Sequence, residues 1–232
     1  MAWKFNEVDQ SVQITDNAAL SLPDSNWSMG GWINFDNVTG SLYQYFISCG
    51  AFNSANTFHW YLYETSTSPS KEIRFIMNGT TISIFSTSTP GDTTGWQHVL
   101  LVRSGSTLTQ YIDGVADGSV AISGGTNCES DLYFGRRAIT PADRWYDGST
   151  AEWAKWDRAL NSGEISDLSG GDAPSNFPTS LAWYIDMIDD YTESEVPLTV
   201  TNNSSTIVTH PSINYPSSFS TAWAIHANTI IG

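Results

Sequence analysis

The sequence contains very few basic residues. Nine of its 232 residues are lysine or arginine, against 24 aspartates and glutamates, and the formal net charge is −15 at pH 7. Nucleic acids and anionic membrane surfaces bind proteins mainly through lysine and arginine. The composition therefore argues against a nucleic-acid partner and against insertion into or adhesion to an anionic membrane.

Cysteine is equally scarce, with Cys49 and Cys128 as the two in the chain. Two cysteines are too few for the disulfide framework of a small secreted domain. We expect buried or isolated thiols, and the sequence leaves open whether the two pair.

The chain also lacks a long apolar run. No segment has the length and hydropathy of a transmembrane helix, and Met1 leads directly into strand-like sequence without the apolar core of a signal peptide. We therefore expect a protein made in a cytoplasm that stays there, or that leaves inside an assembled particle or after lysis.

Aromatic side chains are abundant, with 10 Trp, 10 Tyr and 10 Phe among many Ser, Thr, Asn and Gly residues. Aromatic strands separated by such turn residues are typical of all-β proteins. Residues 95–118 (GWQHVLLVRSGSTLTQYIDGVADG) predict a hairpin with a turn at Gly105. Its first strand is apolar on both faces, which predicts a central strand of a covered sheet. Trp96 would anchor the core if it points inward.

Two further elements follow from local patterns. Val8, Val12 and Ile14 alternate as one opening strand with a bend between them, and residues 160–168 (LNSGEISDL) predict a helix. Asn161 and Glu164 have the spacing of a capping box, and Gly170-Gly171 supplies the stop.

The two parts of the chain differ in charge. All nine basic residues lie at or before Arg158, and residues 159–232 contain eight acidic residues. We predict a sandwich domain over residues 1–172. Residues 173–232 are predicted to be an acidic, proline-rich segment that completes the sandwich edge and ends in an apolar docking arm. A solvated acidic face is the alternative for this segment.

Several stretches together resemble a known family. They are residues 26–33 (NWSMGGWI), 95–114 (GWQHV to YIDG), 132–135 (LYFG), 146–153 (YDGSTAEW) and 158–165 (RALNSGEI). In this order they are similar to the laminin-G-like jelly-roll domain of the concanavalin A-like lectin/glucanase superfamily. The resemblance implies an all-β, two-sheet antiparallel jelly-roll sandwich with one short helix and an irregular C-terminal extension. Residues 210–213 (HPSI) resemble the segment that follows such domains in phage structural proteins.

The sequence predicts no enzymatic activity. Sandwich glycosidases of this superfamily carry a Glu-x-Asp-x-x-Glu strand whose carboxylates perform retaining hydrolysis. Glu129 and Asp131 begin this pattern, but Phe134 stands where the second glutamate belongs. Nucleophile, phosphate-loop and zinc motifs are also missing from the sequence. For His98, in the predicted hairpin, we expect a structural hydrogen bond.

Calcium is an optional ligand in this interpretation, and no other cofactor is indicated. The family carries an acidic pair where this chain has Ala151-Glu152, so one potential ligand is absent. The candidate calcium ligands from loops are Asp113, Asp143 and Asp147. Asp113 precedes a glycine, where aspartate is common for backbone reasons.

The most ligand-like loop covers residues 136–148 (RRAITPADRWYDG). Glycan sites combine an aromatic platform with polar and charged side chains. The candidate glycan-binding residues are Arg136, Arg144, Trp145, Tyr146 and Asp147. The alternative is that the adjacent Trp and Tyr belong to the core or to an interface.

Two functional interpretations follow. The first is a non-enzymatic virion protein, a capsid decoration or tail-fibre adhesion protein on the surface of a phage particle. Its partners would be other virion proteins or copies of itself, with cell-surface polysaccharide as a further ligand. The second is a free lectin-like module that binds carbohydrate with or without calcium.

Overall fold

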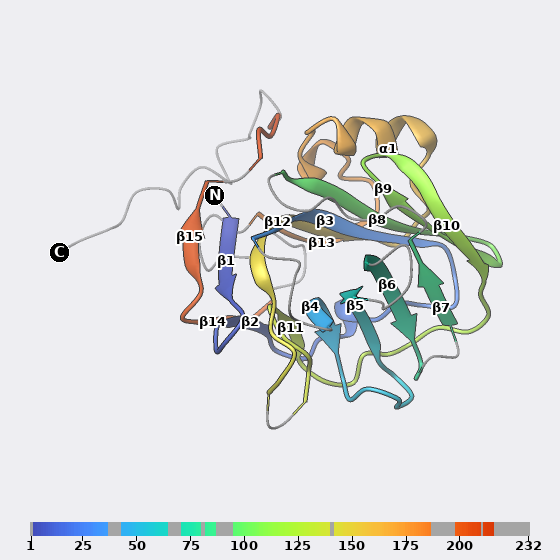
Figure 1. The fold of residues 1–232 in the computed structure, drawn as a ribbon. Helices are drawn as coiled ribbons and strands as arrows, with labels where there is room; N and C mark the ends of the chain where they lie inside the picture. Colours follow the sequence, from blue (N-terminus) through green and yellow to red (C-terminus); the bar gives the residue numbers. More distant parts are fainter. Residues whose placement is uncertain are drawn as a thin grey trace.

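The computed structural model describes residues 2–36, 43–64, 71–79, 82–86, 95–139, 142–186, 198–209 and 211–215. Within them the chain forms two antiparallel sheets packed face to face, with one α-helix on the outside of one sheet (Figure 1). The prediction of an all-β sandwich with one short helix is confirmed. No helix among these residues is long and apolar enough to cross a bilayer.

The larger sheet has eight strands in the described residues. Its order is β10 (Val115–Ala121), β9 (Thr107–Ile112), β8 (Gln97–Ser104), β3 (Trp27–Phe35), β12 (Asp147–Trp156), β1 (Ala2–Asn6) and β15 (Thr206–Val208), and β13 (Leu181–Ile185) also pairs with β12.

The smaller sheet has seven strands in the same part of the chain. Its order is β14 (Val200–Asn203), β2 (Ser11–Ile14), β11 (Leu132–Phe134), β4 (Tyr43–Cys49), β5 (Phe58–Glu64), β6 (Lys71–Met77) and β7 (Ile82–Phe85). Two short 3-10 helices, η1 (Ala18–Leu20) and η2 (Pro174–Asn176), lie in connections.

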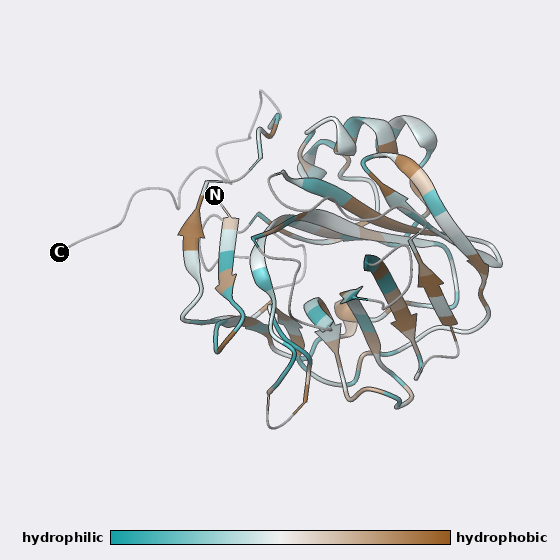
Figure 2. Cartoon of the chain, in the orientation of Figure 1, coloured by the Kyte–Doolittle hydropathy of each residue, from teal (hydrophilic) through white to brown (hydrophobic). Residues whose placement is uncertain are grey.

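The predicted hairpin is confirmed as β8 and β9, which pair from Val99↔Ile112 to Ser104↔Thr107. Its position explains why β8 is apolar on both faces. Val99 and Leu101 enter the core between the sheets, whereas alternate residues of the strand pack under the helix on the outside. Apolar residues run along strands of both sheets (Figure 2).

Trp96 is not a core anchor. It is half-buried and packs against Trp32 and Ala151 on the outer face of the eight-stranded sheet, so its side chain does not point inward. The centre of the core is formed instead by aromatic residues of both sheets. Trp60 and Trp153 lie 5.6 Å apart between ring centroids, in an edge-on arrangement.

The opening segment differs from the prediction of one alternating strand. It forms β1 in the eight-stranded sheet and β2 in the seven-stranded sheet, joined by a corner at Glu7 with φ +61°. Val8 is 67% exposed at this corner, while Val12 and Ile14 are buried in the core. The apolar residues keep alternating in the sequence where the chain passes from one sheet to the other. A pattern of period two therefore does not show that the segment contains two strands in different sheets.

Helix α1 (Ser162–Ser169) confirms the capping-box prediction. The side chain of Asn161 accepts hydrogen bonds from the backbone N–H groups of Gly163 and Glu164, and the Glu164 carboxylate accepts one from the Asn161 N–H. Leu160, Ile165 and Leu168 are buried against the outer face of the eight-stranded sheet. The helix therefore covers the second apolar face of β8.

The chain beyond residue 172 supplies strands to both sheets. Strand β13 pairs with β12, β14 pairs with β2, and β15 pairs with β1. Residues 211–215 then cross the outer face of the eight-stranded sheet, where Asn214 exchanges backbone hydrogen bonds with Gly171 and Ala173. The predicted docking arm, residues 219–232, and His210 lie outside the described residues.

Candidate ligand-binding face

Four tyrosines gather on the outer face of the seven-stranded sheet. Alternation along β5 directs Trp60 and Leu62 into the core and Tyr61 and Tyr63 outward. Tyr43 and Tyr45 of β4 reach the same outer face by alternation, and a register shift between Tyr45 and Ile47 then lets Phe46 and Ile47 both enter the core. The ring pairs are Tyr45 with Tyr61, stacked at 4.6 Å, and Tyr43 with Tyr63 at 4.9 Å.

Four arginines lie against aromatic rings on this face. A guanidinium over a ring gains cation–π attraction while its edge stays available to hydrogen-bond acceptors. The pairs, with the distance from guanidinium carbon to ring centroid, are Arg74 with Tyr63 (3.8 Å), Arg144 with Tyr43 (3.9 Å), Arg136 with Tyr133 (3.8 Å) and Arg137 with Phe52 (5.9 Å). We call these tyrosines and arginines the tyrosine–arginine face.

The loop from 135 to 146 is folded onto the sheet by backbone contacts. Ser48 Oγ donates to the carbonyl of Arg136 at 2.8 Å, and the Tyr45 N–H donates to the carbonyl of Arg144 at 3.3 Å. Arg137 and Asp143 join the two arms of the loop, with Nε donating to Oδ1 at 2.8 Å. Three arginines that are close in sequence are thereby spread over one surface.

A cavity of about 210 Å³ opens beside Arg136. Its lining residues come from three connections and from β11, and they are Gly50, Ala51, Ser130, Asp131, Tyr133, Arg136, Ala138 and Ile139. Pockets for drug-sized ligands typically have roughly 300–1,000 Å³. The cavity is therefore of a size for one small unit of a larger ligand.

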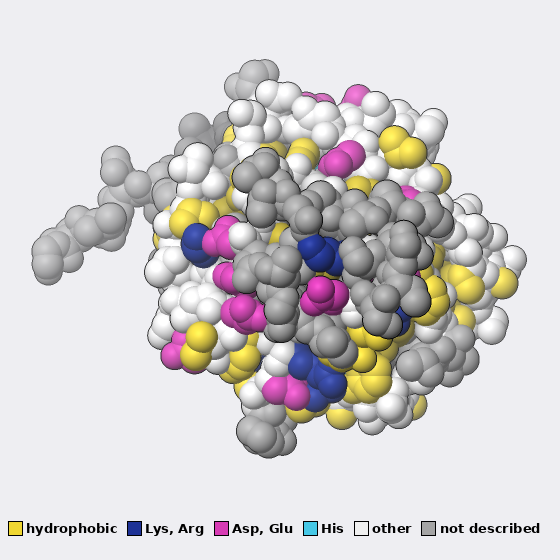
Figure 3. Space-filling model, viewed as in Figure 1, with side chains coloured by type: hydrophobic (Ala, Val, Ile, Leu, Met, Phe, Trp, Pro, Cys, Tyr) yellow, Lys and Arg dark blue, Asp and Glu magenta, His cyan; other side chains and the backbone are white. Residues whose placement is uncertain are grey.

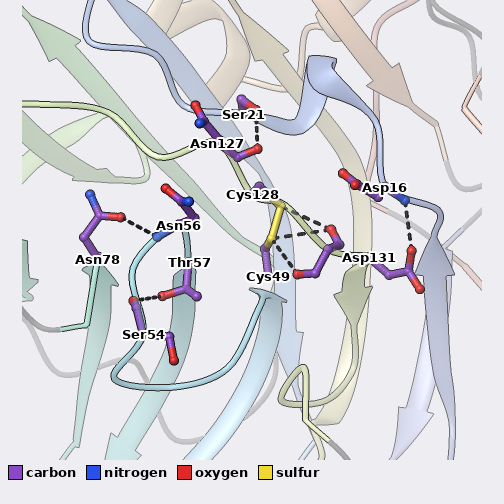
Figure 4. Close-up of a disulfide and its surroundings, with 11 residues drawn as sticks. Asp16, Ser21, Cys49, Ser54, Asn56, Thr57, Asn78, Asn127, Cys128 and Asp131 are labelled. Carbon is purple, nitrogen blue, oxygen red and sulfur yellow. Dashed lines mark hydrogen bonds between the residues drawn. A yellow bond between two sulfur atoms is a disulfide. The ribbon is translucent and has the colours of Figure 1, made fainter.

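A disulfide between Cys49 and Cys128 holds two walls of this cavity together (Figure 4). The Cα atoms of the two cysteines are 5.9 Å apart. The expectation of buried or isolated thiols is therefore wrong about isolation, although both residues are fully buried. Cysteines 79 positions apart meet because β11 pairs with β4, with Leu132 opposite Cys49. Sequence spacing alone does not contain that pairing.

Asp131, beside the disulfide, fixes the rim of the cavity. Its carboxylate accepts hydrogen bonds from Gln13 Nε2 at 2.6 Å and from the Asp16 N–H at 2.9 Å. Figure 4 shows Asp131 pointing toward Asp16. The glycosidase-like pattern at this position is broken structurally as well, because Phe134 is buried in the core against Trp153.

Two buried polar side chains at the tyrosine–arginine face lack a hydrogen-bond partner. They are the Tyr45 hydroxyl and both ring nitrogens of His59, in side chains that are 0% and 1% exposed. Burial, with a smaller contribution from the nearby Arg137 charge, lowers the pKa of His59 to about 3. Burial also raises the pKa of Tyr45. Such unsatisfied groups are uncommon in protein interiors and concentrate at functional sites.

The predicted glycan-binding residues are distributed between surface and core. Arg136 and Arg144 lie on the tyrosine–arginine face, and Trp145 is half-buried with its ring 5.9 Å from the Arg136 guanidinium. Tyr146 is fully buried among phenylalanine rings, and its hydroxyl donates to the Asn34 carbonyl at 2.8 Å. It therefore presents no ring to a ligand, which corrects its assignment.

Asp147 is the first residue of β12 and lies apart from the arginines of the loop. Burial raises the pKa of its carboxyl, and the charges of Glu7 and Asp36 raise it further.

The sequence had no direct signal for the four tyrosines as a site. The pairs Tyr43/Tyr45 and Tyr61/Tyr63, at a spacing of two, were the available hint.

The candidate calcium ligands do not converge. Asp113 Oδ1 accepts the His98 N–H at 2.8 Å in a turn with φ +49°, and Asp143 is bound by Arg137. Among the described residues, no three acidic, histidine or cysteine side chains group as metal ligands would. The imidazole of His98 was expected to form a structural hydrogen bond, but its Nδ1 is buried without a partner. Burial lowers the pKa of this imidazole to about 3.

A buried carboxyl lies on the opposite side of the sandwich, on the outer face of the eight-stranded sheet. Glu152, 1% exposed, accepts hydrogen bonds from the hydroxyls of Tyr184 and of Tyr215, the latter at 2.7 Å. Burial, helped by the Asp186 charge, outweighs the lowering effect of these hydrogen bonds and raises the pKa of Glu152 to about 7. It ties residue 215 to β12.

The sheet order and the jelly-roll sandwich define the class of protein as concanavalin A-like. Residues 6–166 match the family Laminin_G_3, described as "Concanavalin A-like lectin/glucanases superfamily". The chain belongs to this family. No curated protein matches its sequence.

Solved structures resemble the chain at low identity. A putative carbohydrate binding protein from Bacteroides ovatus has a TM-score of 0.68 at 16% identity, with 90% of this chain and 59% of that chain covered. A heptameric SAP-like pentraxin from Limulus polyphemus has 0.57 at 16%, covering 88% and 95%. Domain 4 of the arabinanase AbnA from Geobacillus stearothermophilus, in complex with arabinotriose, has 0.52 at 15%, covering 72% and 76%. These likenesses establish the fold.

Proposed function

We propose that the protein is a non-catalytic carbohydrate-binding protein whose ligand lies on the tyrosine–arginine face. The observation that carries the proposal is a cavity beside Arg136 that opens next to rings and guanidinium groups on one sheet face. Sugar rings pack their apolar faces on aromatic side chains, and their hydroxyls accept hydrogen bonds from arginine.

Two of the similar structures add support for a carbohydrate ligand. One is a putative carbohydrate binding protein, and the other is a domain in complex with arabinotriose. A catalytic role has less support, because Phe134 replaces the second carboxylate of the glycosidase pattern and is buried. Calcium dependence is left to the experiment.

A pair of tryptophan variants tests this function. Trp145→Ala removes a ring beside Arg136, and we expect retention on a responsive glycan to fall about tenfold. Trp96→Ala is the matched control, because this half-buried tryptophan lies on the other sheet, and retention should be unchanged. The measurement is a glycan array with and without calcium. An array without hits under both conditions contradicts the proposal.

For the biological setting we propose a surface adhesion or decoration protein of a phage particle. The resemblance of residues 210–213 and the acidic character of residues 159–232 support it. The disulfide adds support, because cystines persist mainly outside reducing cytoplasm, as on a particle surface. A free lectin-like module is the alternative.

Truncation separates the two settings. We expect the purified protein to self-associate or to bind a larger assembly, and deletion of residues 217–232 to abolish this. Sedimentation velocity of both forms gives the measurement. A monodisperse monomer that is unchanged by the deletion contradicts the particle role but leaves carbohydrate binding intact.

A further inference from the structure

The few basic residues of the chain are unevenly distributed over its surface. Four of the nine lie on the tyrosine–arginine face. Figure 3 shows how sparse Lys and Arg are on one side of the molecule, where several lie beside acidic and hydrophobic side chains. Four of the other basic residues are held in structural contacts: Lys4 with Asp36, Lys155 with Asp157, Arg158 with Glu164, and Arg103 with Asp24 and three carbonyls.

The four arginines of the face differ in their pairing. Arg137 is bound to Asp143, and Arg74 Nε donates to Glu72 at 2.8 Å. Arg144 Nε is 3.9 Å from an Asp143 oxygen that Arg137 already occupies. Arg136 donates to the Ile139 carbonyl at 3.2 Å and has no ion pair among the described residues. Arg136 and Arg144 therefore retain guanidinium donors for a ligand.

The rings beneath these two arginines make the arrangement suitable for a sugar acid. Tyr133 lies under Arg136 in the wall of the cavity, and Tyr43 lies under Arg144. Asp131 also lines the cavity, but its carboxylate is occupied by Gln13 and the Asp16 N–H. A planar guanidinium held on a ring is pre-organised to bind a carboxylate or sulfate with two hydrogen bonds.

The two arginines are too far apart for one sugar. The Arg136 guanidinium lies on Tyr133, which pairs with Ser48 of β4, and the Arg144 guanidinium lies on Tyr43, five residues from Ser48 on the same strand. At a rise of about 3.3 Å per residue the separation along the strand is roughly 15 Å. A ligand that contacts both is therefore a chain of several sugars.

We propose that the ligand is an acidic polysaccharide whose carboxylate or sulfate groups bind Arg136 and Arg144. This inference rests on the proposed function and adds the chemical class of the glycan. A chain with a net charge of −15 repels polyanions at long range, so such binding requires a local site. The repulsion also serves specificity, because anionic polymers without matching spacing are rejected.

Titration calorimetry with three polymers tests the class: polygalacturonate for carboxylate, dextran sulfate for sulfate, and neutral dextran. We expect at least one acidic polymer to bind. Arg136→Gln and Arg144→Gln should each lower its affinity about tenfold, and the double variant about a hundredfold. Lys4→Gln, which removes a surface charge elsewhere, is the control and should retain wild-type affinity.

The outcomes separate the two proposals. Loss of acidic-polymer binding in the arginine variants supports the inference, and the responsive polymer identifies carboxylate or sulfate. Binding of neutral glycans alone, unaffected by either arginine variant, overturns the acidic class and leaves carbohydrate binding in place. Binding of no polymer here and no glycan on the array overturns both.

Discussion

The two outer faces of the sandwich have opposite character. On the eight-stranded sheet, Leu100, Val102 and Trp156 lie under α1 and its flanking residues, and residues 211–215 cross the same side. On the seven-stranded sheet, the outward residues are tyrosines and arginines, with a cavity at one end. Among the described residues, the one α-helix seals an apolar face, whereas the proposed function places the ligand on the aromatic, cationic face, where Tyr45 and Tyr61 are themselves buried. Stability and binding should therefore respond to different substitutions.

The largest effect is expected at the disulfide, because it contributes both to stability and to the proposed binding site. Replacing Cys49 and Cys128 by serine releases a loop of 79 residues in the unfolded chain and should cost about 4 kcal/mol of unfolding free energy. It should also weaken glycan binding, because the cavity walls at Gly50 and Ser130 are no longer joined. Urea unfolding and calorimetry measure the two effects. Unchanged affinity would show that the cavity is not part of the site.

The sealed face should affect stability alone. Leu168→Ala removes a side chain that is 1% exposed and should lower the unfolding free energy by about 3 kcal/mol. Affinity below the unfolding transition should stay at the wild-type value. Asp167→Ala, exposed on the same helix, is the matched control and should change neither quantity. Loss of affinity in Leu168→Ala but not in Asp167→Ala would contradict the expectation that stability and binding depend on different faces.

The unfolding free energy is expected to change with pH by up to about 3 kcal/mol because of Glu152, which lies on the sealed face. Its pKa is raised from 4.5 to about 7 in the folded protein, so the folded state binds the proton more tightly. The resulting stability is complete below pH 4.5 and is lost as the pH rises to about 7. Glu152→Gln should remove this pH dependence of the unfolding free energy, and the variant should be more stable than wild type at pH 8.

Thermal unfolding across pH 4 to 8 measures this effect. Glu129→Gln, at an exposed position, is the control and should keep the wild-type profile. A Glu152→Gln protein that loses stability at pH 8 would contradict the assigned protonation, because the amide preserves partners for both tyrosine hydroxyls.

The smallest effect is a gain in stability from a substitution at the tyrosine–arginine face. His59 lies between the rings of Tyr45 and Phe52, and neither ring nitrogen has a partner. His59→Phe keeps the ring and removes the buried polar atoms, so stability should rise by about 1 kcal/mol. Chemical unfolding measures it. A matching loss of glycan affinity would show that the imidazole is retained for binding rather than for folding.

The fold was more predictable than the site, for a physical reason. The hairpin and the capping box depend on residues within a few positions of each other, and both appear as predicted. The site depends on which face a residue occupies after long-range pairing. Tyr146 and Trp145 are neighbours in sequence, yet one is buried in the core and the other borders Arg136. The four tyrosines and the cystine depend on the pairing of β4 with β5 and β11.

The cystine also has a mechanical consequence. Residues 50–127, which include strands β5 to β10, form a covalently closed loop. Tension applied to the two ends of the chain passes through the sulfur–sulfur bond and bypasses this loop, which hides roughly 260 Å of contour length at about 3.3 Å per residue. An optical-trap experiment should show that extra extension only after reduction. A protein that holds a surface under flow would, in its oxidised form, lengthen less before it yields.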